Sequence, residues 1–212
     1  MFKHETQVIK FLLQWYSMNA RKLPWRKKNN LNLPHPYFVF VSEYMLQQTT
    51  VNTVKNKFNE FILKWPSLNK LAQTSEPNIL KFWSGLGYYS RARNLLKSAK
   101  IIHKNFKNNI PQTYDELIQL PGIGDYTAKA ILGIGYNKSV IPLDANIERI
   151  LVRLHAIDKP INKVKNKLKD LGKKFISDKY SSNLIQSFMD YGSEICLPRN
   201  PKCNICGINK FC

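Results

Sequence analysis

Acidic residues are scarce in this sequence. Its 212 residues include 14 aspartates and glutamates against 33 lysines and arginines, which gives a formal net charge of +19. Such an excess of positive charge predicts a polyanionic partner, such as nucleic acid or an anionic membrane surface. Hydrophobic residues nevertheless make up 43% of the chain and aromatic residues 12%. That share is enough to build a packed core, so a disordered basic tail is excluded.

Long apolar runs are also lacking. No stretch of the sequence approaches the roughly 18 consecutive apolar residues that a membrane helix needs. The N-terminal sequence MFKHETQVIK carries charges of both signs and has no apolar signal core. We therefore expect a soluble, intracellular protein with no membrane partner.

Cysteine is absent from the body of the chain. The four cysteines lie within the last 17 residues, in the spacing C-x6-C-x2-C-x5-C: Cys196, Cys203, Cys206 and Cys212. Such clustering argues against a disulfide framework. Zinc modules usually pair two short C-x2–4-C knuckles, and this run has only one, whereas four thiolates on one loop suit an iron–sulfur cluster. The spacing alone favours the cluster and leaves zinc open.

Strand signals are nearly absent. Only Tyr37–Val41 looks strand-like, and it is too short and isolated to seed a sheet. Elsewhere apolar residues recur at three- and four-residue steps, which predicts helices with one buried face. Ser42, a residue type that caps helix N-termini, opens a long helix expected to reach Trp65. We predict an all-α fold, with further helices at 4–19, 67–73, 77–83, 88–105, 113–120, 126–135, 145–155, 161–176 and 181–192.

The sequence LPGIGDYTAKAIL at 120–132 joins two expected helices through a proline and a Gly-x-Gly turn. Gly122 and Gly124 permit a positive φ and the close approach of another backbone, and the free amides of the following helix could bind an anion. An ordinary helix–helix turn with Asp125 as the cap explains the same pattern. No strand precedes the glycines, so a dinucleotide-binding fold is excluded.

Two carboxylates lie where they could do chemistry. Glu43 is expected in the first turn of the helix that Ser42 opens, where the helix dipole alone would favour an acid by ~0.3–1 kcal/mol. Asp144 follows an apolar stretch at the start of another helix, and aspartate is a preferred N-cap. Backbone N–H bonds and the helix dipole would keep Asp144 ionised at neutral pH, which suits the stabilisation of a cation.

Several segments together resemble the adenine DNA glycosylases, the MutY family of the endonuclease III superfamily. They are LPWR at 23–26, PYFVFVSEYMLQQT at 36–49, GLGYYSRARNL at 85–95, the Gly-x-Gly hairpin, LDAN at 143–146 and MDYGSEIC leading into the cysteines. This resemblance implies a two-lobed helix-hairpin-helix DNA glycosylase fold with a C-terminal iron–sulfur cluster loop. Its implied domains are a six-helix domain at 29–137 and a cluster domain formed by 1–28 and 138–212.

The implied activity is that of a monofunctional DNA glycosylase, which excises adenine mispaired with 8-oxoguanine or guanine in base excision repair. By the resemblance, Glu43 protonates an adenine ring nitrogen, and Asp144 stabilises the oxocarbenium-like sugar or holds it covalently. Tyr126 and Asn146 match positions that support these carboxylates. Relatives that cut the backbone carry a lysine where this chain has Tyr126. A phenol cannot form the Schiff base, so no strong lyase step is expected.

An enzyme of this kind must extrude the base from the helix and fill the gap. The resemblance gives that task to Gln47 and Gln48 and places Tyr88 beside the opposite base. Without the resemblance, Gln47 and Gln48 would be interpreted as solvated polar residues of a helix, and Tyr88 as an aromatic residue packed in the core. The remaining expected DNA contacts are Gly122, Gly124, Lys129 and Arg26, and for Arg26 the alternatives are a phosphate contact and the lining of the adenine pocket. A [4Fe–4S] cluster on the four cysteines is implied as cofactor, and the expected partner of the monomeric protein is double-stranded DNA with a purine mispair, in the bacterial cytoplasm at the nucleoid.

Two features depart from the family pattern. The adenine enzymes usually continue past the cluster into a Nudix-like domain that recognises 8-oxoguanine, whereas this sequence stops at Cys212, so it is either a fragment or a naturally short enzyme with weaker discrimination for the lesion. Ala145 replaces the glycine common in the family's LDGN. Both features favour a rival interpretation, a G:T mismatch thymine glycosylase, while Glu43 with Gln47–Gln48 and the segment Gly85–Tyr89 favour adenine. A DNA-binding module without catalysis and a zinc-dependent nucleic-acid protein are also compatible with the charge and the cysteines.

Overall fold

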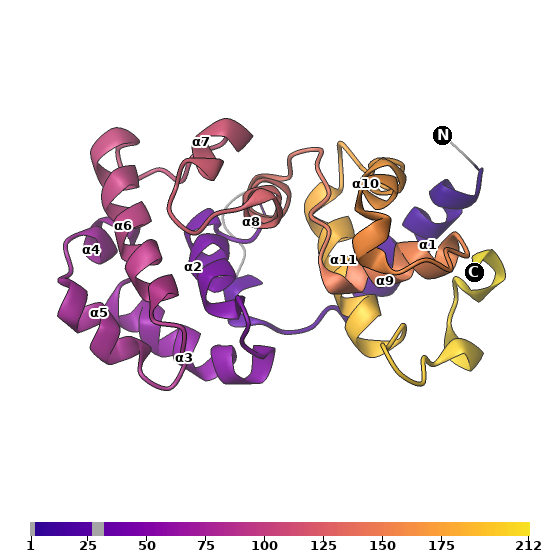
Figure 1. Ribbon diagram of the computed structural model, residues 1–212, viewed down its shortest axis with the longest axis horizontal. Coiled ribbons are helices and arrows are strands. Elements are labelled where there is room, and N and C mark those ends of the chain that lie inside the picture. The colour runs from indigo at the N-terminus through magenta and orange to yellow at the C-terminus, as the bar shows by residue number, and fades with distance from the viewer. Residues whose placement is uncertain (1–2, 27–31) are drawn as a thin grey trace. The chain divides into compact units, whose positions relative to one another are not determined.

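A computed structural model describes residues 3–26 and 32–212, and this part of the chain is built from helices and short turns, without a strand. The α-helices are α1 Lys3–Asn19, α2 Pro36–Leu46, α3 Val51–Lys64, α4 Leu68–Ala72, α5 Glu76–Trp83, α6 Ser90–Asn105, α7 Tyr114–Ile118, α8 Asp125–Ala130, α9 Ala145–Leu154, α10 Lys165–Lys173 and α11 Ser181–Glu194 (Figure 1). The predicted all-α class is confirmed. None of the described helices is both long and apolar enough to cross a membrane.

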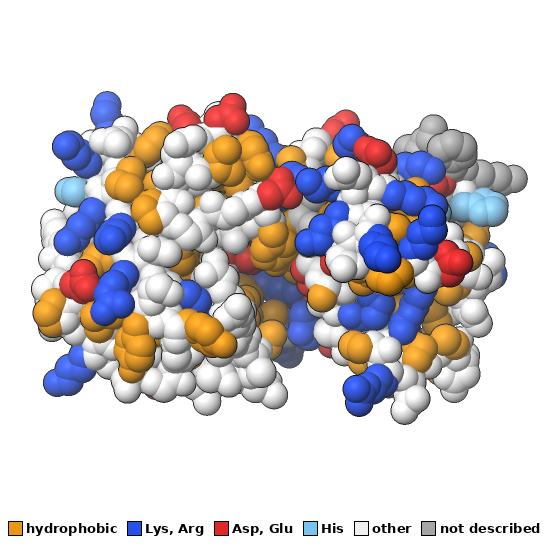
Figure 2. Space-filling model, in the orientation of Figure 1, with side chains coloured by type: hydrophobic (Ala, Val, Ile, Leu, Met, Phe, Trp, Pro, Cys, Tyr) orange, Lys and Arg blue, Asp and Glu red, His pale blue; other side chains and the backbone are white. Residues whose placement is uncertain are grey.

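The chain forms two compact units. Residues 22–136, called here the central unit, contain α2 to α8. The terminal unit combines residues 1–21 with 137–212 and contains α1, α9, α10, α11 and the cysteines (Figure 1). Lysine and arginine side chains outnumber acidic ones on the visible face of both units, as the net charge requires (Figure 2).

Helix α2 forms the core of the central unit. It packs against α3, α6, α8 and the π-turn Ile131–Gly135, and its side chains are buried on every side rather than along one stripe. Aromatic rings fill the space around α3, where Phe61 lies 4.7 Å from Trp65 between ring centroids. Burial on all faces explains why α2 lacks the amphipathic spacing of the outer helices.

Helix α11 is the corresponding core element of the terminal unit. It packs against α1 and α9, and α10 covers α9. Arg21, at the end of the N-terminal segment, donates its Nε–H to the fully buried Asp190 of α11 at 2.5 Å. The main-chain N–H of Arg21 donates to the other oxygen of that carboxylate at 3.0 Å. These contacts attach the N-terminal helix to segments more than a hundred residues later in the chain.

The expectation for residues 37–65 was wrong in two respects. Tyr37–Val41 is helical, because Pro36 provides a helix-compatible first residue and His35 Nδ1 accepts a hydrogen bond from the Tyr37 N–H at 3.2 Å. The long helix is also interrupted, since α2 ends at Leu46 and the Thr50 hydroxyl caps α3 by accepting from the Thr53 N–H. Ser42 is therefore no N-cap, and its hydroxyl donates to the Val39 carbonyl within α2.

Three other predicted helices have different limits. The helix expected from residue 88 begins at Ser90. The one expected at 126–135 consists of α8 followed by the π-turn, whose Gly135 packs so closely on Pro36 that a Cβ there would lie 3.3 Å from the Pro36 Cα. The one expected at 161–176 divides into a 3-10 turn, Ile161–Lys163, and α10. The remaining helices occur where the apolar spacing indicated.

Candidate functional site

Glu43 lies in the last turn of α2, not in the first turn of a helix as expected. The side chain is buried, with 7% of the residue exposed. The C-terminal end of a helix carries the negative end of the dipole, so the dipole disfavours a carboxylate there. The helix-dipole explanation for an acid at this position is therefore removed. A buried glutamate at such a site is a candidate for acid–base chemistry.

The two glutamines that follow α2 have different surroundings. Gln47 donates its side-chain amide to the main-chain carbonyl of Gly122 at 3.2 Å, which joins this turn to the hairpin. Gln48 is exposed and has a φ of 57°, in the left-handed region that residues other than glycine rarely adopt. Tyr44 adds a second link, because its hydroxyl donates to the Pro121 carbonyl at 2.6 Å. The end of α2 and the hairpin are thus one connected piece of structure.

Only one of the two hairpin glycines uses its conformational freedom. Gly122 has a φ of +82°, and a Cβ there would lie 2.9 Å from the Asn94 side-chain nitrogen and 3.1 Å from the Tyr44 ring. Gly124 has an ordinary φ of −103°, and a Cβ there would meet nothing within 4 Å. Within the described structure the hairpin itself therefore requires Gly122, whereas the space beside Gly124 is open.

The residues after the glycines begin α8. Gly124 occupies the N-cap position, so Asp125 is the first helical residue and not the cap that an ordinary turn would use. Its carboxylate accepts from the Tyr114 hydroxyl at 3.0 Å and forms an ion pair with Lys129 at 2.8 Å. Lys129 is thus partly neutralised within the hairpin rather than directed wholly to solvent. Tyr126 follows on the same turn and is partly buried.

Tyr88 lies on the loop between α5 and α6 and is 62% exposed. The interpretation that it packs in the core is therefore wrong. Its φ of 46° makes it, like Gln48, a non-glycine residue in the left-handed region. Arg26 ends the 3-10 turn Pro24–Arg26 and is partly buried. Gln47, Gln48, Tyr88 and Arg26, with Glu43 and the hairpin, all belong to the central unit.

Asp144 belongs to the terminal unit, and its predicted capping role is confirmed. Its Oδ1 accepts from the Ile147 N–H at 2.7 Å at the start of α9. Its Oδ2 accepts from the Asn146 side-chain amide at 2.9 Å. Burial raises the pKa of the Asp144 carboxyl above its ordinary value, while these hydrogen bonds and the Arg149 guanidinium act to lower it.

Arg149 is not among the predicted site residues, although it lies beside Asn146. It donates to the Asn146 side-chain oxygen at 2.8 Å, to the Gly192 carbonyl at 2.6 Å and to the Cys196 carbonyl at 2.7 Å. Gly192 permits this close packing, since a Cβ there would lie 2.5 Å from the Asn146 Cβ. A continuous set of hydrogen bonds therefore leads from Asp144 to the first cysteine. The glycine within MDYGSEIC was the available signal that another element approaches α11.

The cysteine run forms a loop of 3-10 turns beyond α11. Arg153 donates to the Cys196 sulfur at 3.2 Å, and its carbonyl accepts from the Cys212 thiol at 3.6 Å. The Tyr191 hydroxyl donates to the Cys206 sulfur at 3.2 Å. Burial, followed by the three other thiols, raises the pKa of Cys212, so the four sulfurs are close enough to interact. All four are free of disulfides.

This donor set suits a cofactor held by four thiolates, and hydrogen bonds to the ligating sulfurs are usual in such sites. Within residues 3–26 and 32–212 no group of three or more histidine, cysteine or acidic side chains is arranged to hold a single metal ion. The support for a cofactor is therefore the chemistry of four neighbouring thiols on one loop, with two side chains that donate to them.

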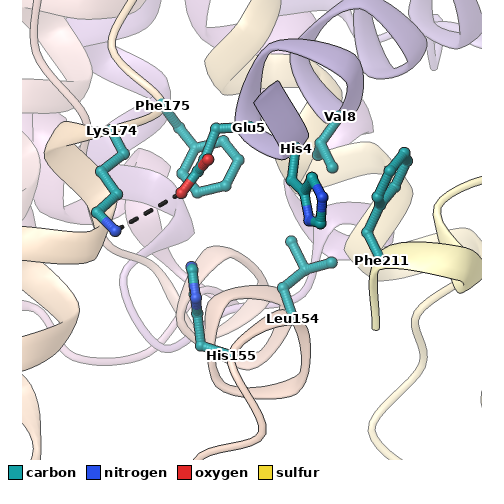
Figure 3. Close-up of a pocket in the computed structure, with 8 residues that line it drawn as sticks. All are labelled: His4, Glu5, Val8, Leu154, His155, Lys174, Phe175 and Phe211. Carbon is teal, nitrogen blue, oxygen red and sulfur yellow. Dashed lines mark ion pairs between the residues drawn. The ribbon is translucent and has the colours of Figure 1, made fainter. Parts of the chain in front are cut away.

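A separate cavity lies in the terminal unit (Figure 3). Its volume is about 410 Å³ and Glu5, Lys174, His155 and Phe211 are among its lining residues. Lys174 and Glu5 form an ion pair at 3.6 Å across one side of the cavity. None of the predicted site residues lines this cavity, so the cavity is not part of the predicted site.

Comparison with known proteins agrees with the fold and the motifs. The family model described as HhH-GPD superfamily base excision DNA repair protein matches residues 41–174. A Buchnera aphidicola protein named adenine DNA glycosylase is 44% identical over 203 residues, covering 95% of this chain and 56% of the relative. A human protein of the same name is 36% identical over 221 residues, covering 100% of this chain and 40% of the relative. The solved structure of a thermostable thymine-DNA glycosylase aligns with a TM-score of 0.88 and 25% identity, over 99% of this chain and 95% of that one.

The all-helical fold with its Gly-x-Gly hairpin is that of the helix-hairpin-helix glycosylases. This chain belongs to the HhH-GPD superfamily of base excision DNA repair proteins. It spans about half the length of the curated relatives that it matches.

Proposed function

We propose that this chain is a monofunctional DNA glycosylase that hydrolyses the N-glycosidic bond of adenine mispaired with 8-oxoguanine or guanine. The observation that carries the proposal is the burial of Glu43 at the C-terminal end of α2, where the helix dipole gives an acid no benefit. The names of relatives with 44% and 36% identity support the same activity.

In the proposed mechanism two acids, one from each unit, are used in opposite protonation states. Glu43 in its carboxylic acid form gives its proton to an adenine ring nitrogen, which makes the base a neutral leaving group. The C1′–N bond breaks with its electron pair passing to the base, a water molecule adds to the sugar, and the proton that the water loses returns to the Glu43 carboxylate. The products are free adenine and an abasic site.

Asp144 as a carboxylate stabilises the oxocarbenium-like sugar, or holds it covalently until water attacks. Its hydrogen bond from Asn146 fixes the carboxylate orientation, and Arg149 fixes Asn146 in turn. Tyr126 supports the carboxylates in this proposal. Because a phenol cannot form an imine with the sugar, the proposed enzyme has no strong lyase step.

DNA contact is assigned to residues of the central unit. Gln47, Gln48 and Tyr88 would fill the gap left by the base, and the exposure of Gln48 and Tyr88 supports that role. The amides near Gly122 and Gly124, together with Lys129 and Arg26, would contact phosphates without reading sequence. The open space beside Gly124 is the structural support for the hairpin contact.

The proposed cofactor is a [4Fe–4S] cluster on Cys196, Cys203, Cys206 and Cys212. When bound, such a cluster cross-links the loop and supplies a redox-active centre. The chain's own contribution is a pair of hydrogen bonds, which Arg153 and Tyr191 donate to two of the sulfurs. Arg199 and Lys202, both exposed, extend the basic surface of the loop. The partner is double-stranded DNA, bound by a monomer.

The thymine glycosylase alternative is supported by the 0.88 TM-score with a thymine-DNA glycosylase and by Ala145 in place of glycine. Incubation of the protein with duplexes containing A:8-oxoG, A:G or G:T pairs separates the two. We expect release of adenine from the first two and its loss in Glu43→Gln by several orders of magnitude. Release of thymine alone would overturn the proposal. Binding without release from any duplex would favour a non-catalytic DNA-binding module.

A further inference from the structure

Arg91, on α6, is buried beneath the end of α2, with 5% of the residue exposed. Its Nη1 donates to the main-chain carbonyls of Met45 at 2.7 Å and Tyr44 at 3.3 Å, and also to the carbonyl of Gln47. The last carbonyls of a helix have no partners within the helix and carry the negative end of its dipole. The guanidinium therefore closes the C-terminal end of the helix that carries Glu43.

The same guanidinium also contacts the loop between α5 and α6. Its Nη2 donates to the carbonyls of Leu86 at 2.7 Å and Gly87 at 3.1 Å. Trp83 supports the arrangement, because its indole N–H donates to the Gly87 carbonyl at 3.2 Å and its ring lies 5.6 Å from the Arg91 Cζ. The end of α2 with the turn after it and the loop between α5 and α6 are about forty residues apart in sequence, and one side chain thus joins them.

A planar guanidinium is suited to this task, because its two terminal nitrogens direct donors to opposite sides at fixed angles. A lysine ammonium is a point charge with three donors on one atom, and cannot bind two loops in the same geometry. Of the three guanidinium nitrogens of Arg91, only Nε has no hydrogen-bond acceptor among the described residues. The residue type is therefore specified by the two sets of carbonyls rather than by charge alone.

Each loop has a strained residue next to a carbonyl that Arg91 binds. Gln48, with a φ of 57°, follows Gln47, and Tyr88, with a φ of 46°, follows Gly87. Such conformations cost free energy in non-glycine residues and persist only where the surroundings enforce them. Both strained side chains are exposed. The contacts from Arg91 are placed where they can enforce both conformations together.

We infer that Arg91 is a positioning residue that couples Gln48 and Tyr88, so that the two side chains enter the duplex as a single rigid wedge. The inference rests on the proposed function for the use of the wedge, but the coupling itself is a property of the free protein. Gln48 and Tyr88 would then lose their cooperation when the guanidinium is replaced, even though neither is altered.

Hydrogen exchange of the free protein tests the coupling without any catalysis. We expect Arg91→Lys to speed amide exchange roughly tenfold in both segments, 46–50 and 84–89. The matched control is Arg93→Ala, which removes an exposed arginine of the same helix that pairs with Glu76 at 2.8 Å, and it should leave both segments unchanged. Faster exchange in one segment only, in neither, or throughout the chain with loss of helical circular dichroism would overturn the inference.

A double-mutant cycle tests the consequence for base release. In the parent protein, Gln48→Ala and Tyr88→Ala should reduce the single-turnover rate on an A:8-oxoG duplex non-additively, with a coupling of roughly twofold or more. In the Arg91→Lys background the two effects should multiply independently. Coupling that survives Arg91→Lys, or that is absent from the parent, would contradict the inference. A parent that releases no base would instead contradict the proposed function and leave the exchange result to decide on Arg91.

Discussion

The carboxylate of Asp144 caps α9 through one oxygen and accepts the Asn146 side-chain amide through the other, at 2.7 Å and 2.9 Å. One side chain thereby begins a helix, and in the proposed function the same fixed carboxylate supplies a negative charge. These two roles can be separated by substitution, because asparagine caps a helix about as well as aspartate but carries no charge.

We expect Asp144→Asn to reduce base release by roughly a hundredfold or more, since the developing cation loses its counter-charge. Its thermal stability should change little, because the cap is retained. Asp144→Ala should lose base release too, and should in addition cost about 1 kcal/mol of stability. Single-turnover kinetics and thermal melting of both variants measure the two effects. Substantial base release by Asp144→Asn would show that the charge is not used.

The pH dependence follows from the raised pKa of Asp144. The proposed mechanism requires this carboxylate to be ionised, so the rate of base release should fall as pH decreases through a value above the ordinary 3.8. Because the folded-state pKa exceeds the unfolded one, the folded protein binds the proton more tightly, and this group lowers the free energy of unfolding as pH rises through that window. A pH–rate profile measures the fall in rate at acidic pH. Thermal melting at several pH values measures the effect on stability, with Asp144→Asn as the control. An acidic limb at or below 3.8 would contradict the assignment.

The two hairpin glycines provide a matched pair. Gly122→Ala should destabilise the protein by roughly 1–3 kcal/mol, because φ is +82° and the new Cβ would meet Asn94 and Tyr44. Gly124→Ala should leave stability nearly unchanged, since its φ is ordinary and the space is open. If the hairpin contacts DNA, Gly124→Ala should weaken duplex binding instead. Thermal melting and titration with a labelled duplex distinguish the two effects. Unchanged duplex binding by Gly124→Ala would show that the hairpin does not contact DNA.

Tyr126 is the position at which a lyase activity could be introduced. Borohydride reduction traps an imine between a lysine and the sugar. Because the parent protein has a tyrosine at position 126, it should give no trapped complex with substrate DNA. Tyr126→Lys should give a detectable covalent complex if position 126 faces the sugar. Tyr126→Phe is the control, and should give none. A trapped complex with the parent protein would show that another amine performs the lyase step.

The cofactor proposal predicts about four iron and four sulfide atoms per chain after anaerobic purification, with a brown colour. Cys206→Ser should lose the cluster, whereas Tyr191→Phe should retain it and shift its reduction potential, because a hydrogen bond to sulfur is removed. Metal analysis and electrochemistry of the DNA-free protein provide both readouts. Stoichiometric zinc in a colourless protein would favour a zinc site instead.

Much of the fold was accessible from local patterns. The apolar spacing that predicted α3, α6, α9 and α11 is a property of each segment, and α9 has both a predicted cap and a buried face. The same reasoning failed for α2, because β-branched and aromatic residues favour strands only while their neighbours are unknown. Burial on every side of α2 made that preference irrelevant. Roles for the candidate site residues, including the cofactor ligands, stay predictions.

The sequence by itself determined the helical class, the hairpin, the cap at Asp144 and the grouping of the cysteines, because each depends on residues that are neighbours along the chain. Only the tertiary structure decided that α2 ends before Gln47, that Glu43 is buried in its last turn, and that Arg91 binds carbonyls of both the end of α2 and the loop between α5 and α6. These features depend on contacts between segments that are distant in sequence. A local sequence pattern does not specify which distant carbonyls a buried guanidinium binds.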